Sequence, residues 1–409
     1  MTLCLFEDGL VGHLAPLALT RAAFDLRVGA RTLADAALTA FPAERVAFHT
    51  RPEVNAVTAE EHPSWSSTPP AGPTLFVNGR WLVRDGDALS AVRATQGRAE
   101  PHAIIQDDTL VALWHPAPPA DASPLALAEG AVATSVSGAQ LIERLWDLID
   151  TLGERIADDL VASGDLGHIA RVVQGGAVLV GRERIHVAAT ASVKAGAVLS
   201  AEDGPIWIGP EAVVGEHAVL KGPVYLGPKA VVKPGARIDT SVVGFWSKVG
   251  GEVHGSVVHS LSSKAHDGYL GNSYLGRWCN LGAGTNTSNL KNDYGEVTIH
   301  DAVEGSAVAS GRQFAGLFMG DHSKCSIHTM FNTGTVVGVF CNLFGADFPP
   351  RHVPSFSWGG AGGFAPYRTE KAFRVAEAVM SRRNRQLSSA ERQLLGSIAE
   401  VHHGTIDPG

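Results

Sequence analysis

The residues best suited to chemistry lie between Lys264 and Asn286, in the stretch KAHDGYLGNSYLGRWCNLGAGTN. This segment gathers a histidine, an aspartate, tyrosines, a tryptophan and asparagines, separated by glycines, in a chain otherwise rich in aliphatic repeats. The imidazole of His266 can take up a proton near neutral pH, and the amides and hydroxyls around it can hold a polar ligand. The segment is therefore a candidate site for acid–base chemistry.

The elements that must position this segment are six-residue repeats. A large aliphatic residue recurs every six positions, and a small residue or valine follows four positions after each, which is neither a helical nor a simple strand period. The same phase returns in a second block from Met319 to Leu343. The first block comprises Ile208, Val214, Leu220, Leu226, Val232 and Ile238, followed by Ala212, Ala218, Val224, Ala230, Ala236 and Val242.

Hexads of this kind predict a left-handed parallel β-helix, an exception to the usual right-handed crossover. Each hexad supplies a short strand and a turn, and three hexads close one triangular coil. Looser hexads extend this solenoid upstream to about Val178. The period is interrupted between 244 and 317, so the candidate segment is expected on loops that project from a rigid scaffold.

The rest of the chain divides around the solenoid. Strand-like and helix-like patterns predict an α/β domain over residues 1–135, and an amphipathic run predicts a connector helix within 136–170. The β-helix is expected over 171–362. Two helices are expected over 363–409, the second opened by Ser389, and we interpret both as packing or oligomer elements.

Composition excludes several classes of function. A net charge of -8 and a pI near 6.1 do not favour a nucleic-acid partner. No apolar run is long enough to span a membrane, and the start lacks the pattern of a secretory signal, so a cytoplasmic protein is expected. The four cysteines show no C-x-x-C spacing, which favours reduced, structural thiols over a metal site or a disulfide framework.

The stretches SKAHDGYLGNSYLGRWCNLGAGTNTSNLKN and GLFMGDHSKCSIHTMFNTGTVVG resemble the GlmU-like family of divergent bacterial proteins, which combine hexapeptide repeats with a sugar nucleotidyltransferase domain. The resemblance implies an N-acetyltransferase that acts on an amino-sugar phosphate in nucleotide-sugar biosynthesis and uses acetyl-CoA. It also implies nucleotidyl transfer from UTP or another NTP, with Mg²⁺ if that domain is active. A prism with exposed flat faces further predicts a homotrimer.

Carried over residue by residue, the resemblance makes His266 the general base and Tyr269, Asn280 and Asn289 the groups that hold the sugar and the acetyl group. Lys233 resembles the arginine that grips the sugar phosphate. The family also has a lysine about twelve residues before the histidine, where this chain has His254; Lys248 and Lys264 lie only near that position. The acceptor sugar is therefore left open.

The acetyl donor is expected along the uninterrupted block from Met319 to Leu343. An extended groove there suits a long molecule such as coenzyme A. Gly320, Ser323 and Thr335 offer backbone or hydroxyl partners, and Lys324 offers a cation for phosphate.

The opening LFEDGLVGHLAPLALTRAAFDLRVG resembles the phosphate-binding start of sugar nucleotidyltransferases, in altered form. Gly9 keeps its place, whereas His13 stands where the family has an arginine and Ala23 where it has a lysine. Arg21 and Arg27 are candidate phosphate cations. Asn78 stands where a metal-binding aspartate would follow a central strand, so no metal ligand is expected at this position. The domain then has two interpretations: it binds nucleotide in altered form, or it only packs on its neighbour.

Three alternatives stay open beside acetyl transfer. The solenoid could serve only to trimerise a sugar-1-phosphate nucleotidyltransferase, or the whole chain could be a non-catalytic scaffold. A zinc hydratase is disfavoured because His322 and His328 are six residues apart and so fall on successive faces of one coil.

Overall fold

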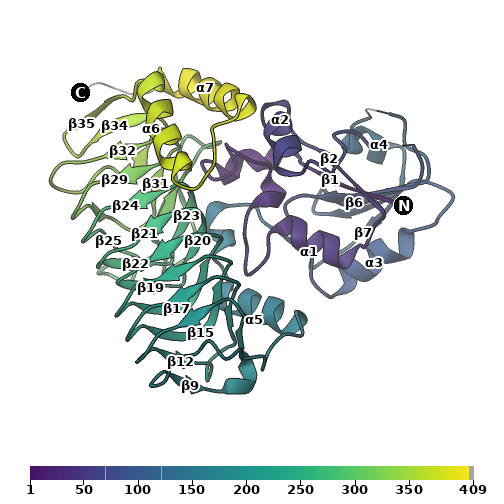
Figure 1. Ribbon diagram of the computed structural model, residues 1–409. Helices are drawn as coiled ribbons and strands as arrows, with labels where there is room; N and C mark the ends of the chain where they lie inside the picture. The colour runs from purple at the N-terminus through teal and green to yellow at the C-terminus, as the bar shows by residue number, and fades with distance from the viewer. Residues whose placement is uncertain (70, 121, 405–409) are drawn as a thin grey trace. The chain divides into compact units, whose positions relative to one another are not determined.

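A computed structural model describes residues 1–69, 71–120 and 122–404 (Figure 1). Their contacts divide the chain into two compact units. The first comprises Met1–Leu14, Ala18–Leu26 and Arg31–Arg144, and the second comprises Ala15–Leu17, Arg27–Ala30 and Leu145–Gly409. No helix within the described ranges is long and apolar enough to cross a bilayer.

The first unit contains a six-stranded mixed sheet with the strand order β2-β1-β3-β6-β5-β7. Its central strands are continuous apolar runs, and every residue of β1 and β3 is buried. Strands β2, β1 and β3 run parallel, β6 is antiparallel to both β3 and β5, and β7 is parallel to β5. The strands are β1 (Thr2–Phe6), β2 (Arg45–His49), β3 (Thr74–Asn78), β5 (His102–Gln106), β6 (Thr109–His115) and β7 (Val132–Ser135).

Helices and short 3₁₀ turns connect these strands. The first α-helix begins at a capping box in which the side chains of Thr32 and Asp35 each accept a hydrogen bond from the other's backbone N–H. The predicted α/β domain is thereby confirmed. Its helices are η1 (Gly9–Leu14), η2 (Ala23–Asp25), α1 (Leu33–Ala40), α2 (Pro52–Glu61), α3 (Asp87–Thr95) and α4 (Pro124–Glu129).

The second unit contains the predicted left-handed parallel β-helix. Figure 1 shows its coils stacked from β9 to β35, with α5 beside β15 and β17 and with α6 and α7 at the C-terminal end of the stack. We name three faces. The first face comprises β10 (Ile185–Val187), β13 (Ile206–Ile208), β20 (Val257–Ser260), β23 (Tyr274–Arg277), β28 (Leu317–Met319), β31 (Thr335–Val337) and β33 (His352–Val353).

The second face is a separate ten-stranded sheet. It comprises β11 (Ser192–Val193), β14 (Val213–Val214), β16 (Val231–Val232), β18 (Lys248–Val249), β21 (Ser263–Lys264), β24 (Asn280–Leu281), β29 (Lys324–Cys325), β32 (Asn342–Leu343), β34 (Ser357–Gly360) and β35 (Gly363–Pro366).

The third face carries the remaining solenoid strands. Two long strands, β15 (Val219–Leu226) and β17 (Arg237–Val243), span the third and first faces. The third face further comprises β9 (Val178–Val180), β12 (Val198–Ser200), β19 (Glu252–His254), β22 (Tyr269–Gly271), β25 (Asn286–Thr287) and β30 (Met330–Phe331).

The six-residue period folds this way because its large residue points into the prism. Ile208 pairs with Leu226, and Leu226 pairs with Val243 one coil further on. These side chains are fully buried and belong to one continuous hydrophobic core. Each coil therefore buries its apolar column on its neighbours, which is the main source of stability in a stacked repeat.

The candidate segment is more regular than its sequence suggests. Val243 pairs with Val258, and Val258 pairs with Leu275, so shortened coils continue the ladder through the region expected to be loops. That expectation is wrong for 263–281, which contains β21, β22, β23 and β24. The ladder makes one large excursion, because Leu275 pairs next with Met319. The excursion includes an antiparallel hairpin of β26 (Thr298–Asp301) and β27 (Ser306–Ala309).

The expected long connector helix within 136–170 is wrong in extent. Residues Gln140–Leu141 form β8 and pair with β4 (Trp81–Leu82), and Leu145–Leu148 form the 3₁₀ helix η3. The α-helix α5 covers only Leu152–Ala162, because Thr151 adopts a left-handed backbone conformation with φ of 50°. A further 3₁₀ turn, η4 (Arg182–Arg184), follows.

Both expected tail helices are confirmed, as α6 (Thr369–Ser381) and α7 (Ser389–His403). The N-cap of α7 is Ser388, one residue before the predicted opening, and it forms a capping box with Glu391. Helix α6 buries Ala372, Ala376 and Met380.

Candidate functional site

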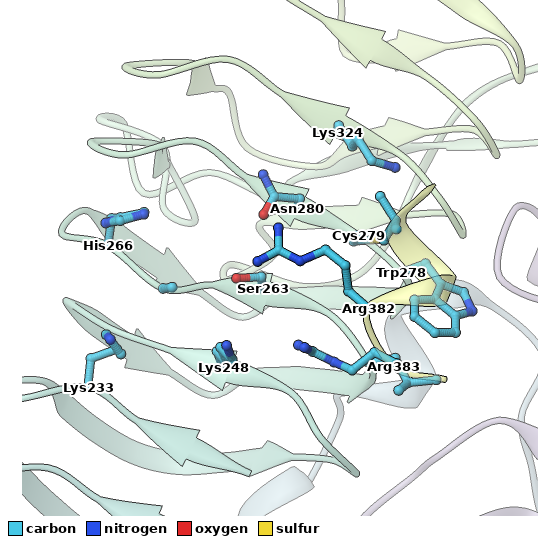
Figure 2. A pocket seen from close by; sticks show the side chains of 13 residues that line it. Lys233, Lys248, Ser263, His266, Trp278, Cys279, Asn280, Lys324, Arg382 and Arg383 are labelled. Atoms are coloured by element: carbon cyan, nitrogen blue, oxygen red, sulfur yellow. The ribbon is translucent and has the colours of Figure 1, made fainter. Parts of the chain in front are cut away.

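The second face of the solenoid contains a pocket of about 530 Å³ (Figure 2). Its floor is a column of outward-facing positions that are paired strand by strand: Lys248, Ser263, Asn280 and Lys324. Neighbouring strands lie about 4.8 Å apart, so the column presents one side chain per coil at close spacing. The full lining is Lys233, Lys248, Leu261, Ser263, Ala265, His266, Trp278, Cys279, Asn280, Lys324, Val379, Arg382 and Arg383.

The lining is strongly cationic. Three lysines and two arginines surround the pocket together with His266, and none of the lining residues that the structure describes carries a carboxylate. Burial lowers the pKa of Lys248, and the charges of Arg383, Lys233 and Arg382 lower it further. The Nε atom of Arg383 is buried and lacks a hydrogen-bond partner among the residues that the structure describes. This arrangement favours an anionic ligand.

Lys264 supports the pocket from inside the solenoid. It is paired with Val249, at a position that points into the core, and it is 2% exposed. Its Nζ donates hydrogen bonds to the backbone oxygens of Gly250, at 2.8 Å, and His266, at 2.6 Å. Burial lowers its pKa to about 8, against a small raising effect of Asp267. The ammonium thus anchors the corner from which His266 projects.

The structure brings three of the predicted acceptor-site residues together. His266, Asn280 and Lys233 all line the pocket, and all three side chains are exposed. His266 lies on a bend after β21, at the corner between the second and third faces. Within the described part of the chain its ring makes no hydrogen bond to protein, so both ring nitrogens are available to a ligand.

Tyr269 and Asn289 are not among the residues that line this pocket. Tyr269 begins β22 on the third face, and the Nδ2 atom of Asn289 donates to the Tyr269 hydroxyl at 3.1 Å and to Oδ1 of Asn272 at 2.7 Å. Burial raises the pKa of Tyr269, although the hydrogen bond from Asn289 lowers it. The predicted acceptor site is therefore divided between two faces that meet at the His266 corner.

The predicted donor residues are mostly interior. Ser323 is fully buried and donates to Gly338 O at 2.6 Å, and Thr335 is fully buried and donates to Asn332 O at 2.8 Å. A Cβ atom at Gly320 would lie 2.9 Å from the backbone of Gly338. Only Lys324 of this set lines the pocket.

The nucleotide candidates of the first unit are largely engaged in the fold. Gly9 begins η1, and Arg144 donates to Nδ1 of His13. Arg21 is 4% exposed. Asn78 is 1% exposed and donates to Asp8, at 2.8 Å, and to Leu110 O, at 2.9 Å.

Arg27 belongs to the second unit rather than the first. Its backbone N–H donates to the hydroxyl of Tyr274 at 2.9 Å, and its guanidinium lies 5.7 Å from the ring centroid of Tyr225. The five predicted nucleotide contacts are thus spread over both units.

Sequence reasoning missed Arg382 and Arg383 as pocket residues and Lys264 as the anchor of the His266 corner. The two arginines follow α6, far along the chain from the solenoid strands that form the rest of the site, so no local motif reveals them. A signal did exist for Lys264. It lies six residues after Val258 and six before Leu270, both buried in the core, so the hexad period itself assigns it to the interior.

We expect anion affinity at this pocket to fall as pH rises. Burial lowers the pKa of Lys324 to about 8, against a raising effect of Cys279, so its positive charge is present below pH 8 and is lost above it. Sulfate keeps its charge over this range, and its affinity measured by calorimetry should drop about three- to tenfold between pH 7 and pH 9. Lys324→Met should reduce this dependence, and an affinity that rises with pH would contradict the assignment.

Comparison with known proteins gives matches for parts of the chain. Residues 3–164 match a family model described as sugar nucleotidyl transferase. A bifunctional sugar-1-phosphate nucleotidylyltransferase/acetyltransferase of Sulfurisphaera tokodaii is 33% identical over 93 residues, which are 23% of this chain and 23% of that protein. The bifunctional protein GlmU of Methanococcus vannielii is 36% identical over 87 residues, 21% of this chain and 20% of that protein.

Among solved structures, the UDP-N-acetylglucosamine acyltransferase of Francisella novicida aligns with 58% of this chain and 92% of its own, with 12% identity and a TM-score of 0.27. The chain spans about a quarter of the length of the curated relatives it matches. The resemblance to the GlmU-like family that the sequence predicts is confirmed by these matches.

Proposed function

We propose that this protein is a transferase of nucleotide-sugar biosynthesis that acetylates the amine of an amino-sugar phosphate in the pocket of the second face. The observation that carries the proposal is the meeting of His266, Asn280 and Lys233 in one cationic pocket. These are three of the residues that the family resemblance assigns to the acceptor. The similarity to bifunctional nucleotidylyltransferase/acetyltransferases supports the same activity.

The proposed chemistry needs a base and an anion site, and the pocket offers both. The acceptor amine is protonated near neutral pH and cannot attack a carbonyl carbon in that form. His266 would take one proton from the amine, the amine nitrogen would bond to the acetyl carbon, and the carbon–sulfur bond would break, with the leaving thiolate taking up a proton. Lys233 and Lys248 would hold the sugar phosphate, and Asn280 would donate to an oxygen of the sugar or the acetyl group.

Acetyl-CoA is the proposed donor, although its binding differs from the sequence expectation. The side chains of Ser323 and Thr335 donate to backbone oxygens inside the solenoid, so they offer no groups to a surface groove. Lys324 faces the pocket and fits a phosphate of the donor. Donor recognition in this proposal therefore rests on cations rather than on hydroxyl groups.

Nucleotidyl transfer by the first unit is a second candidate, supported by the family match over residues 3–164. The position of the family's metal-binding aspartate does not fit Mg²⁺ here, because Asn78 already donates to Asp8 and Leu110. Both carboxylate oxygens of Asp8 accept hydrogen bonds from Arg80. Among the described residues no three His, Cys, Asp or Glu side chains converge as metal ligands.

A homotrimer in the cytoplasm is part of the proposal. Tyr269 and Asn289 lie on the third face, around the corner from the pocket on the second face. In a parallel assembly the third face of one copy can lie against the second face of the next, which would complete the acceptor site. Light scattering should give three times the monomer mass, and a monomer at micromolar concentration would refute this assembly.

One experiment separates the proposed activities. The purified chain is incubated with acetyl-CoA, glucosamine 1-phosphate, UTP and magnesium, while free thiol and pyrophosphate are followed separately. Thiol release that depends on the amino sugar supports acetyl transfer, and pyrophosphate release supports nucleotidyl transfer. Pyrophosphate release alone would favour a trimerising solenoid without acetyl transfer, and neither product would favour a non-catalytic scaffold.

A further inference from the structure

Two arginines at the end of α6 reach over the second face of the solenoid. Arg382 and Arg383 directly follow the last residue of the helix, and Figure 2 shows their guanidinium groups directed toward Lys248, Ser263 and Asn280. The guanidinium of Arg383 lies 5.0 Å from the ring centroid of Trp246, which holds the side chain by a cation–π contact. The charge of Arg383 is therefore positioned by a packed element of the solenoid.

The structure places these arginines among like charges. Burial lowers the pKa of Lys248, and the nearby positive charges of Arg383, Lys233 and Arg382 lower it further. Within the described ranges of the chain, the buried Nε of Arg383 has no hydrogen-bond partner. Cations at the C-terminal end of a helix stabilise it by opposing its dipole. That role alone does not explain why both guanidinium groups line a pocket whose described lining residues carry no carboxylate.

The number of positive charges exceeds what one phosphate needs. A phosphomonoester carries a charge of about −1.5 to −2 at neutral pH, which Lys233 and Lys248 can balance. Lys324, Arg382 and Arg383 then remain in the same pocket without a counter-charge from its lining. A second phosphate group would neutralise them. Two adjacent guanidinium groups also provide the planar, bidentate donors that phosphate oxygens accept best.

We propose that Arg382 and Arg383 bind the second phosphate of a ligand with two linked phosphates, so that the pocket recognises a diphosphate group. This inference rests on the proposed function, because it places the first phosphate near Lys233 and Lys248 if the acceptor supplies the diphosphate, and near Lys324 if the donor supplies it. Two sources of the diphosphate share this chemistry. One is a nucleoside-diphosphate sugar used as the acceptor, and the other is the diphosphate bridge of coenzyme A.

Calorimetric titrations of the full chain test this proposal without requiring turnover. The probes are glucosamine 1-phosphate, inorganic pyrophosphate, UDP-glucosamine and coenzyme A. The double variant Arg382→Ala/Arg383→Ala is compared with Arg374→Ala/Arg385→Ala, which removes two exposed arginines of the same tail that do not line the pocket. Melting temperatures of both variants report whether the fold is kept.

We expect the pocket variant to weaken pyrophosphate and one of the two diphosphate ligands about 30-fold or more, and glucosamine 1-phosphate less than about threefold. The control variant should bind all probes like the unaltered chain. Selective loss of UDP-glucosamine identifies the acceptor as the source, and selective loss of coenzyme A identifies the donor. Equal losses for mono- and diphosphates, or no loss, would overturn the proposal.

Failure of this inference can also be distinguished from failure of the proposed function. Arginine-dependent diphosphate binding without any acetyl transfer would leave this inference standing and remove the activity. Acetyl transfer that is unaffected in the pocket variant, together with unchanged diphosphate binding, would remove the inference and leave the activity.

Discussion

His266→Ala should lower the rate of acetyl transfer by about a hundredfold or more while leaving the fold intact. Loss of a general base costs roughly 10²–10⁴-fold in rate. The ring of His266 is exposed, and its backbone oxygen, which accepts the Lys264 hydrogen bond, is kept in alanine. Thiol release should therefore fall sharply, whereas the melting temperature and the mass by light scattering should stay near those of the unaltered chain.

The matched control for this variant is His168→Ala. His168 is also exposed, lies in the second unit and does not line the pocket. Its replacement should change neither rate nor melting temperature. If His266→Ala instead loses stability and keeps its activity per folded molecule, then His266 is a structural residue and the base lies elsewhere.

Arg80→Ala should be among the most destabilising single changes in the first unit. The Arg80 side chain is fully buried and donates to both oxygens of Asp8, at 2.8 and 2.7 Å, and to Ile142 O, at 2.9 Å. Burial alone would raise the pKa of Asp8, but the hydrogen bonds and charge of Arg80 hold it below its ordinary value. Removing one partner of a buried ion pair typically costs about 3–5 kcal/mol of unfolding free energy.

Hydrogen exchange followed by mass spectrometry can measure this loss of unfolding free energy in the first unit, from peptides that cover β1 and β3. Faster exchange in Arg80→Ala than in Arg45→Ala, which alters an exposed arginine at the start of β2, would support the structural role. Replacing Asp8 and Arg80 together by apolar residues should cost less than either single change, because no buried charge is then left unpaired. Normal exchange together with lost nucleotide binding would instead make Arg80 a ligand contact.

The solenoid could be predicted from sequence because one local rule, a large apolar residue every six positions, fixes both the strand and its inward face. The same rule also indicates which side chains are unavailable to a ligand. Ser323 and Thr335 occupy the small positions of the repeat, and both are fully buried. The prediction that they line a surface groove took account of their hydrogen-bonding groups. It did not take account of their position in the six-residue repeat, which places both side chains inside the solenoid.

Other features could not be predicted, because they depend on contacts between distant segments. Arg382 and Arg383 reach the pocket only because α6 packs its buried alanines against the rest of the second unit. The connector pattern from 138 to 160 is amphipathic throughout, yet the left-handed conformation of Thr151 ends any continuous helix. The hexad phase does assign Lys264 to the interior, but it does not show that the buried ammonium donates to the backbone oxygens of Gly250 and His266.

The part of the excursion over residues 289–316, which contains β26 and β27, gives the molecule a place where its surface can change independently of its scaffold. The excursion closes on itself at its base, where Ala315 N–H donates to Asn289 O at 3.0 Å and Gly316 N–H donates to Asn272 O at 2.8 Å. After the excursion Met319 pairs with Leu275, so the first face of the solenoid continues. Since lengthening a closed loop costs little entropy, the turn between β26 and β27 should accept a grafted peptide or small reporter domain. The same property would let descendants of this chain diversify that turn while Lys248, Asn280 and Lys324 keep their spacing.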